Sequence, residues 1–136
     1  MIKLSIKTGI FSLVISLIPS FCFADWVQIS TSAGYVRNFM DPKTIKELPS
    51  GNIQVWTKSE YDRPNERGWR SATAMVESNC TEKKSRLVVF AGFEKSFLKG
   101  KRVDVDLEQS GWFFIEPNSN GQILLDLTCN PKSPRR

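Results

Sequence analysis

Short apolar runs separated by turn residues occupy most of the chain between residues 26 and 116. Apolar and polar side chains alternate along these runs, as in strands that bury one face. Val55 is predicted to point to one face of its strand, and Trp56 and Lys58 to the other. The expected strands lie within residues 25–30, 34–40, 52–61, 69–80, 86–94 and 101–108.

Turn signals divide these runs in three places. Asp41 can cap one helical turn that begins at Pro42, because proline suits the first helical position. Residues 62–68 contain breakers and predict a loop. Residues 95–101 predict a hairpin, with Gly100 marking the turn. Val103 is expected to point inward from the strand that follows this turn.

The region after residue 111 is harder to assign. An aromatic strand is expected to stop at Pro117. Residues 120–128 fit helical periodicity and strand alternation equally well. The preceding residues 118–120 offer helix caps. The pattern therefore predicts a mainly β (α+β) domain with a single antiparallel sheet of about six strands, one face of which needs a cover.

The first 24 residues predict a secretory signal peptide. Lys3 and Lys7 precede an uncharged apolar stretch, Gly9–Ile18, and Ala24 is a small residue suited to cleavage. The stretch is short for a transmembrane helix, although an uncleaved anchor is the alternative. We expect a domain over 25–130 and a flexible basic tail over 131–136.

Cys22 raises a second alternative, a lipid anchor. A lipoprotein signal requires a small residue directly before the cysteine, and Phe21 is bulky. Cleavage after Ala24 would discard Cys22 and leave two cysteines in a compartment that permits disulfides. We therefore expect a Cys80–Cys129 bridge and no membrane anchor after cleavage.

The charge balance argues against a nucleic-acid partner. The whole chain has a net charge of +5, but five of its 19 basic residues lie in the leader and the tail. The remaining 14 Lys and Arg side chains equal the 14 Asp and Glu side chains in number. A basic face is therefore not needed to explain the high overall pI.

The residue types exclude several kinds of chemistry. The chain contains no histidine, which removes the usual catalytic triads and imidazole zinc ligands, and two bridged cysteines provide no thiolate. Asp104 and Asp106 share one face of an expected strand. We favour the interpretation that this face is exposed to solvent over the interpretation that the two carboxylates act in acid–base catalysis. We expect no cofactor, no metal and no enzyme activity.

Residues 62–70 form the candidate binding loop. They contain the types that dominate binding hot spots, namely Arg63, Arg67, Trp69 and Arg70. The competing interpretation is a polar loop beside a core tryptophan. The Lys and Arg side chains around 95–102 are interpreted as charges that protect the neighbouring apolar run from aggregation.

The chain resembles the bacterial surface-adhesin protein E family over almost all of the expected domain. No single motif is specific, but the order and spacing together are. The matching positions are Trp26, Val55-Trp56, Tyr61, Trp69-Arg70-Ser71, Cys80, Arg86, Gly100, Trp112, Pro117, Ser119 and Cys129. Asn79 departs from the family, which usually has Asp there.

The resemblance implies an antiparallel sheet covered by a C-terminal helix that the Cys80–Cys129 bridge holds in place. It also implies an exported protein, in the periplasm or at the cell surface, that binds a protein partner from the host. The alternative is a structural or stress-related periplasmic protein without a host target. The oligomeric state is left open, a homodimer included.

Overall fold

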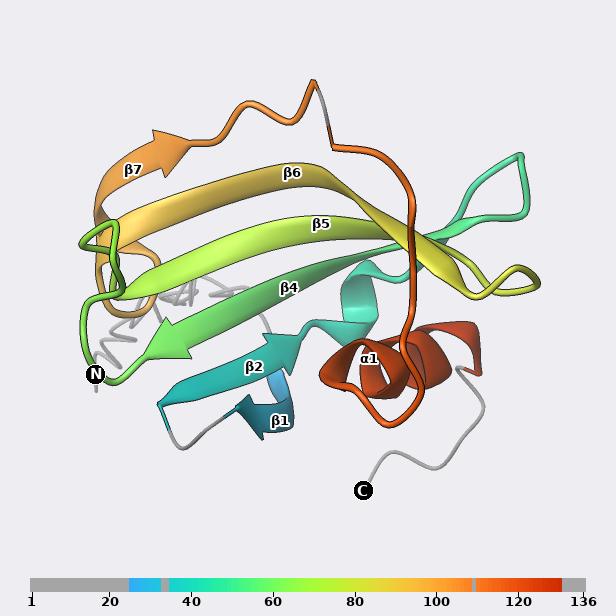
Figure 1. The fold of residues 1–136 in the computed structure, drawn as a ribbon, viewed down its shortest axis with the longest axis horizontal. Coiled ribbons are helices and arrows are strands. Elements are labelled where there is room, and N and C mark those ends of the chain that lie inside the picture. The colour runs from blue at the N-terminus through green and yellow to red at the C-terminus, as the bar shows by residue number, and fades with distance from the viewer. Residues whose placement is uncertain (1–24, 33–34, 109, 131–136) are drawn as a thin grey trace, which may run out of the picture.

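A computed structural model describes residues 25–32, 35–108 and 110–130. The predicted signal peptide, Cys22 and the basic tail lie outside these residues. The described part is one antiparallel sheet with a helix against it (Figure 1).

Six strands form the main path of the sheet, in the order β1-β2-β4-β5-β6-β7, and two short strands pair with its members. β3 pairs with β4, and β8 pairs with β6. The strands are β1 (Val27–Ser32), β2 (Val36–Met40), β3 (Lys46–Glu47), β4 (Ile53–Tyr61), β5 (Ser71–Asn79), β6 (Lys84–Lys95), β7 (Lys99–Asp104) and β8 (Phe113–Phe114). The prediction of about six antiparallel strands is confirmed.

Two local signals act as the sequence indicates. The side chain of Asp41 caps a 3-10 helix, η1 (Pro42–Thr44), and accepts a hydrogen bond from the backbone N–H of Lys43 at 3.0 Å. Ser119 caps the α-helix α1 (Asn120–Cys129) and accepts from the N–H of Gln122 at 3.2 Å. Each cap satisfies an N–H that lacks an intrahelical partner.

The helix covers one face of the sheet. The buried core contains Met40, Val55, Ala74 and Val76, and Leu124 and Leu127 pack against it. Val55 lies opposite Val76 in the register of β4 and β5, and both side chains are buried in this core. Full burial of a valine, leucine or methionine side chain contributes about 1.5–3 kcal/mol.

A disulfide ties the helix to the sheet. Cys80 directly follows β5, Cys129 ends α1, and their Cα atoms lie 5.8 Å apart. The C-terminal helix and the Cys80–Cys129 bridge are therefore both confirmed.

The hairpin between β6 and β7 lies in the predicted segment, 95–101, but its turn is not at Gly100. Its turn consists of residues 96–98, whereas Gly100 lies within β7 with a positive φ of 80°. β7 ends at Asp104. Val103 pairs with Gly92 and so points to the expected face of the sheet, but it is 38% exposed and is not buried there. As an edge strand, β7 pairs on one side only and buries little surface.

Candidate functional site

The candidate loop, Asp62–Arg70, joins β4 to β5 at the end of the sheet that lies on the left in Figure 1. Asn65 organises it: its side-chain oxygen accepts from the N–H groups of Arg67 at 3.0 Å and Trp69 at 2.9 Å. Its carbonyl oxygen accepts from the N–H of Gly68 at 2.9 Å, where φ is +79°. An Asx turn of this kind fixes the loop backbone locally.

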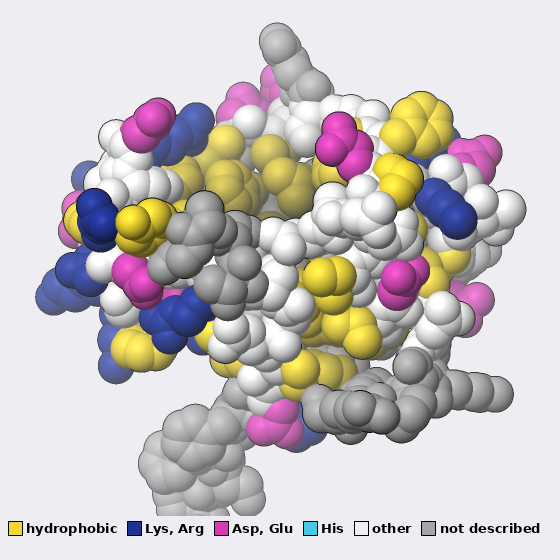
Figure 2. All heavy atoms as spheres, turned by 60° about the horizontal axis from the view of Figure 1, so that its bottom comes forward, with side chains coloured by type: hydrophobic (Ala, Val, Ile, Leu, Met, Phe, Trp, Pro, Cys, Tyr) yellow, Lys and Arg dark blue, Asp and Glu magenta, His cyan; other side chains and the backbone are white. Residues whose placement is uncertain are grey.

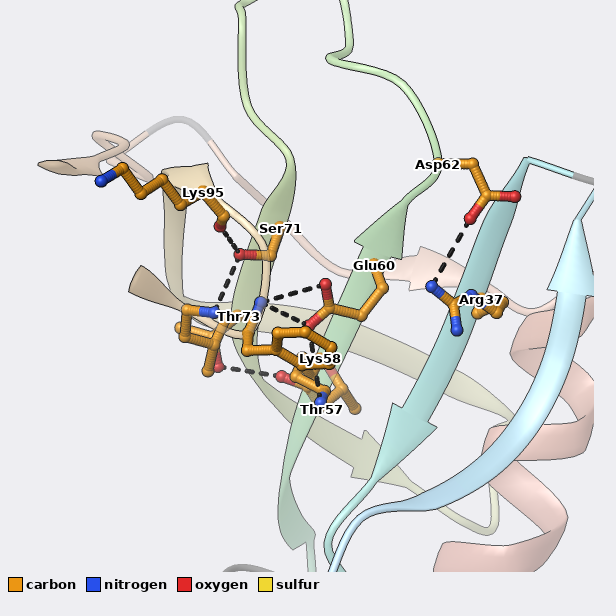
Figure 3. Close-up of polar contacts among 10 residues, drawn as sticks. Arg37, Thr57, Lys58, Glu60, Asp62, Ser71, Thr73 and Lys95 are labelled. Carbon is orange, nitrogen blue, oxygen red and sulfur yellow. Dashed lines mark hydrogen bonds and ion pairs between the residues drawn. The ribbon is translucent and has the colours of Figure 1, made fainter. Parts of the chain in front are cut away.

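Neighbouring strands hold both ends of the loop. The N–H of Asp62 donates to the carbonyl of Tyr35 at 3.0 Å, and the N–H of Arg70 donates to the carbonyl of Phe93 at 2.9 Å. The Asp62 carboxylate also pairs with the Arg37 guanidinium at 3.5 Å (Figure 3). At the end of β4, burial raises the pKa of the Tyr61 phenol, and a hydrogen bond with Asn65 partly opposes that rise.

Trp69 supports the loop from inside the protein. It is 5% exposed, and its ring makes an edge-to-face contact with Phe90 at a centroid distance of 5.9 Å. A Cβ atom at Gly92 would lie 1.9 Å from the indole ring, so the ring rests directly on the glycine backbone. Of the four predicted loop residues, Trp69 is therefore the one that is not presented to solvent.

The three arginines of the loop are exposed. The Arg63 guanidinium lies 4.5 Å from the ring centroid of Tyr35, and that of Arg67 lies 5.2 Å from the ring of Trp69. Arg70 donates to the backbone carbonyl of Asp62 at 3.2 Å. Within the described ranges none of the three forms an ion pair, so aromatic rings orient two guanidinium groups without neutralising them.

The turn of the β6–β7 hairpin lies at the same end of the sheet. Phe97 and Leu98 have φ values of 60° and 58°. The N–H of Phe97 donates to both carboxylate oxygens of Glu60, at 3.0 and 3.1 Å, and the N–H of Leu98 donates to Ser71 Oγ at 3.0 Å. Ser71 Oγ in turn donates to the carbonyl of Lys95 at 2.6 Å (Figure 3).

A buried ion pair lies beneath this turn. Lys58 Nζ is 3.5 Å from Glu60, and the two side chains are 9% and 2% exposed. The ammonium also lies 4.7–5.7 Å from three ring centroids, those of Trp26, Phe39 and Phe97. This cluster was not predicted. The available signal was the spacing of Lys58 and Glu60, which places both on one face of a strand.

Cations gather at this end of the sheet. We define the basic end as residues 35–37, 62–70 and 94–104, which contain eight Lys and Arg side chains against four Asp and Glu. The described residues together contain 14 Lys and Arg side chains and 14 Asp and Glu side chains, so the rest of the domain is net acidic. Figure 2 shows Lys and Arg side chains clustered on the left of the molecule.

The described residues contain no group of three His, Cys, Asp or Glu side chains that could hold a metal ion. Among those same residues, no helix has the length and apolar character to cross a membrane.

Asp104 pairs with Arg102 at 2.8 Å, and both side chains are largely exposed, as the solvated interpretation of this strand predicts.

Comparison with known proteins identifies one family. The model of the surface-adhesin protein E family matches residues 26–130. None of the curated proteins matches the chain significantly.

Solved structures of Haemophilus influenzae protein E share the fold. Crystal form II is 14% identical and covers 77% of this chain and 97% of its own, with a TM-score of 0.56. The selenomethionine form is 15% identical and covers 74% and 89%, with a TM-score of 0.57. Protein E from a non-typeable strain is 14% identical and covers 79% and 86%, with a TM-score of 0.51.

Proposed function

This chain belongs to the surface-adhesin protein E family, and on that basis we propose that it is an exported binding protein whose partner is a host extracellular protein. The family is one of adhesins, a generally non-catalytic class. The residue types agree with binding, because the chain has no histidine and its Cys80 and Cys129 are bridged.

The proposal rests on the loop arginines, which are exposed and have no ion-pair partner among the described residues. Arg63, Arg67 and Arg70 are exposed and form no ion pair with the described residues. A guanidinium stacked on a ring keeps its N–H edge available for a bidentate carboxylate. Stacking also lowers the entropy that binding must remove, since the side chain is already restricted.

Export is the second part of the proposal. The sequence up to Ala24 has the pattern of a signal peptide, and the adhesin family suggests an exported or surface location. We place the start of the mature chain at Asp25, with no lipid on Cys22. The domain then occupies 25–130, and 131–136 form a basic tail.

The experiment uses the exported protein as immobilised bait. Purified host extracellular matrix proteins are applied singly, and bacterial envelope extract is applied in parallel. We expect saturable binding of at least one matrix protein. Binding of an envelope protein alone, with no matrix protein bound at any concentration, would contradict the proposal and support the periplasmic alternative.

A further inference from the structure

The turn of the β6–β7 hairpin is held in a conformation that its own residues disfavour. Phe97 and Leu98 both have φ near 60°, a region that bulky L residues rarely adopt. Such a backbone persists where its surroundings determine it, and these positions cluster at binding sites. The surroundings here are Glu60 and Ser71, which are 2% and 0% exposed and bind the two consecutive N–H groups.

The result of this arrangement is an exposed aromatic ring. Phe97 is 64% exposed, although the N–H of the same residue is bound by a buried carboxylate. The Lys58 ammonium lies 5.7 Å from the centroid of its ring. A solvent-facing phenyl ring is an apolar group of the kind that is enriched at binding surfaces.

Unpaired cations flank this ring. Lys95 lies opposite Lys99 in the hairpin register, and Lys101 follows on the same strand. All three are exposed, and none forms an ion pair with a described residue. Such charges complement an acidic partner.

We propose that Phe97 and the unpaired cations of the basic end form one contact surface, and that this surface takes an acidic polypeptide segment carrying an apolar side chain. The apolar side chain contacts Phe97, and the acidic residues face Lys95, Lys99, Lys101 and the loop arginines. This inference rests on the proposed function, because it assigns a chemical class to the partner.

The placement of the two loops favours a polypeptide over a membrane. Trp69 rests on Gly92, which pairs with Ala72 on the face that the helix covers. Phe97 contacts Lys58, which points to the opposite face of β4 from Val55. A planar bilayer contacts one side of the sheet end, whereas a flexible chain follows both. A sulfated polysaccharide lacks the apolar group that Phe97 would bind.

The test measures fluorescence anisotropy of two short labelled peptides with the full exported protein. One peptide consists of glutamates with interspersed leucines, and the other has serine in place of leucine. The variants are Phe97→Asn, since Asn tolerates positive φ, and the pair Lys99→Gln with Lys101→Gln. The controls lie at the other end of the sheet: Phe114→Asn, at a 79% exposed site, and Lys46→Gln with Lys83→Asn.

We expect Phe97→Asn to weaken binding of the leucine peptide by about tenfold, as for a hot-spot anchor, and to leave the serine peptide nearly unchanged. The lysine pair should weaken both peptides, and the controls neither. The inference is overturned if neither peptide binds, if Phe114→Asn matches Phe97→Asn, or if only phosphatidylglycerol vesicles bind in a Phe97-dependent way.

The outcome separates the two proposals. Binding of a matrix protein that Phe97→Asn and the lysine pair leave unchanged would overturn this surface and keep the proposed function. Phe97-dependent binding of the leucine peptide without any matrix partner would support the surface and contradict the host target.

Discussion

Replacing Glu60 with Gln should destabilise the domain by about 3 kcal/mol, because it leaves the buried ammonium of Lys58 without its anion. Lys58 and Glu60 are 9% and 2% exposed at their side chains, and their charged atoms lie 3.5 Å apart. Gln keeps an acceptor for the N–H of Phe97, so the substitution removes mainly the charge.

The magnitude follows from two opposing contributions. Removing one partner of a buried ion pair costs about 3–5 kcal/mol. Three aromatic rings, those of Trp26, Phe39 and Phe97, remain around the ammonium and offset part of this loss. Cation–π contacts contribute about 0.5–2 kcal/mol, which places the expected value at the lower end of the range.

Urea unfolding of four proteins measures this effect: the parent, Glu60→Gln, Lys58→Met and the double variant. The double variant should be more stable than Glu60→Gln alone, because it leaves no buried charge unpaired. Glu94→Gln is the matched control at an exposed site, with an expected change under about 0.5 kcal/mol. A Glu60→Gln midpoint equal to that of this control would refute the reasoning.

Three further predictions concern the leader and the fold. Replacing Cys80 and Cys129, which are 49 residues apart, with alanine should lower the free energy of unfolding by roughly 4 kcal/mol in the loop-entropy model; a loss below about 1 kcal/mol by urea titration would contradict it. Gly92→Ala should cost at least about 1–3 kcal/mol, since its Cβ would meet the Trp69 ring, and an unchanged melting temperature would exclude that contact. Intact mass should place the start of the exported protein at Asp25, and a lipid-modified mass would contradict it.

Local signals made most of the fold predictable. Alternation located the strands, and short-range hydrogen bonds at Asp41 and Ser119 determined where the helical segments begin. Residues 120–128 were ambiguous because their apolar positions fit two periods. Packing of Leu124 and Leu127 on the core, together with the bridge at Cys129, selects the helix, and neither contact is local in sequence.

Within the predicted segment 95–101, the position of the turn differs from the prediction for a similar reason. Gly100 carries the strongest local turn signal, yet the turn lies at residues 96–98. Glu60 and Ser71 fix it there, and they precede Phe97 and Leu98 by 37 and 27 residues. A pattern read along one strand contains no information about such contacts.

The candidate loop was located correctly as a loop, but the roles of its residues depend on the fold. Trp69 is buried because the glycine at position 92 leaves space for its ring on a neighbouring strand. The ring partner of Arg63 is Tyr35, which directly precedes β2. The residue types predicted a binding loop. Which of its side chains are exposed, and which residues support them, could be learned only from the structure.

The association rate of a matrix partner with the Arg63→Ala, Arg67→Ala double variant tests the central claim most directly. Both side chains are exposed and unpaired among the described residues, so folding should change by less than about 0.5 kcal/mol. The account predicts a rate about three- to tenfold lower at low salt, with a smaller difference at high salt. The control pair Lys46→Gln with Lys83→Asn should leave the rate unchanged. An unchanged rate for the folded arginine variant at both salt concentrations would contradict the claim that this loop is the binding site.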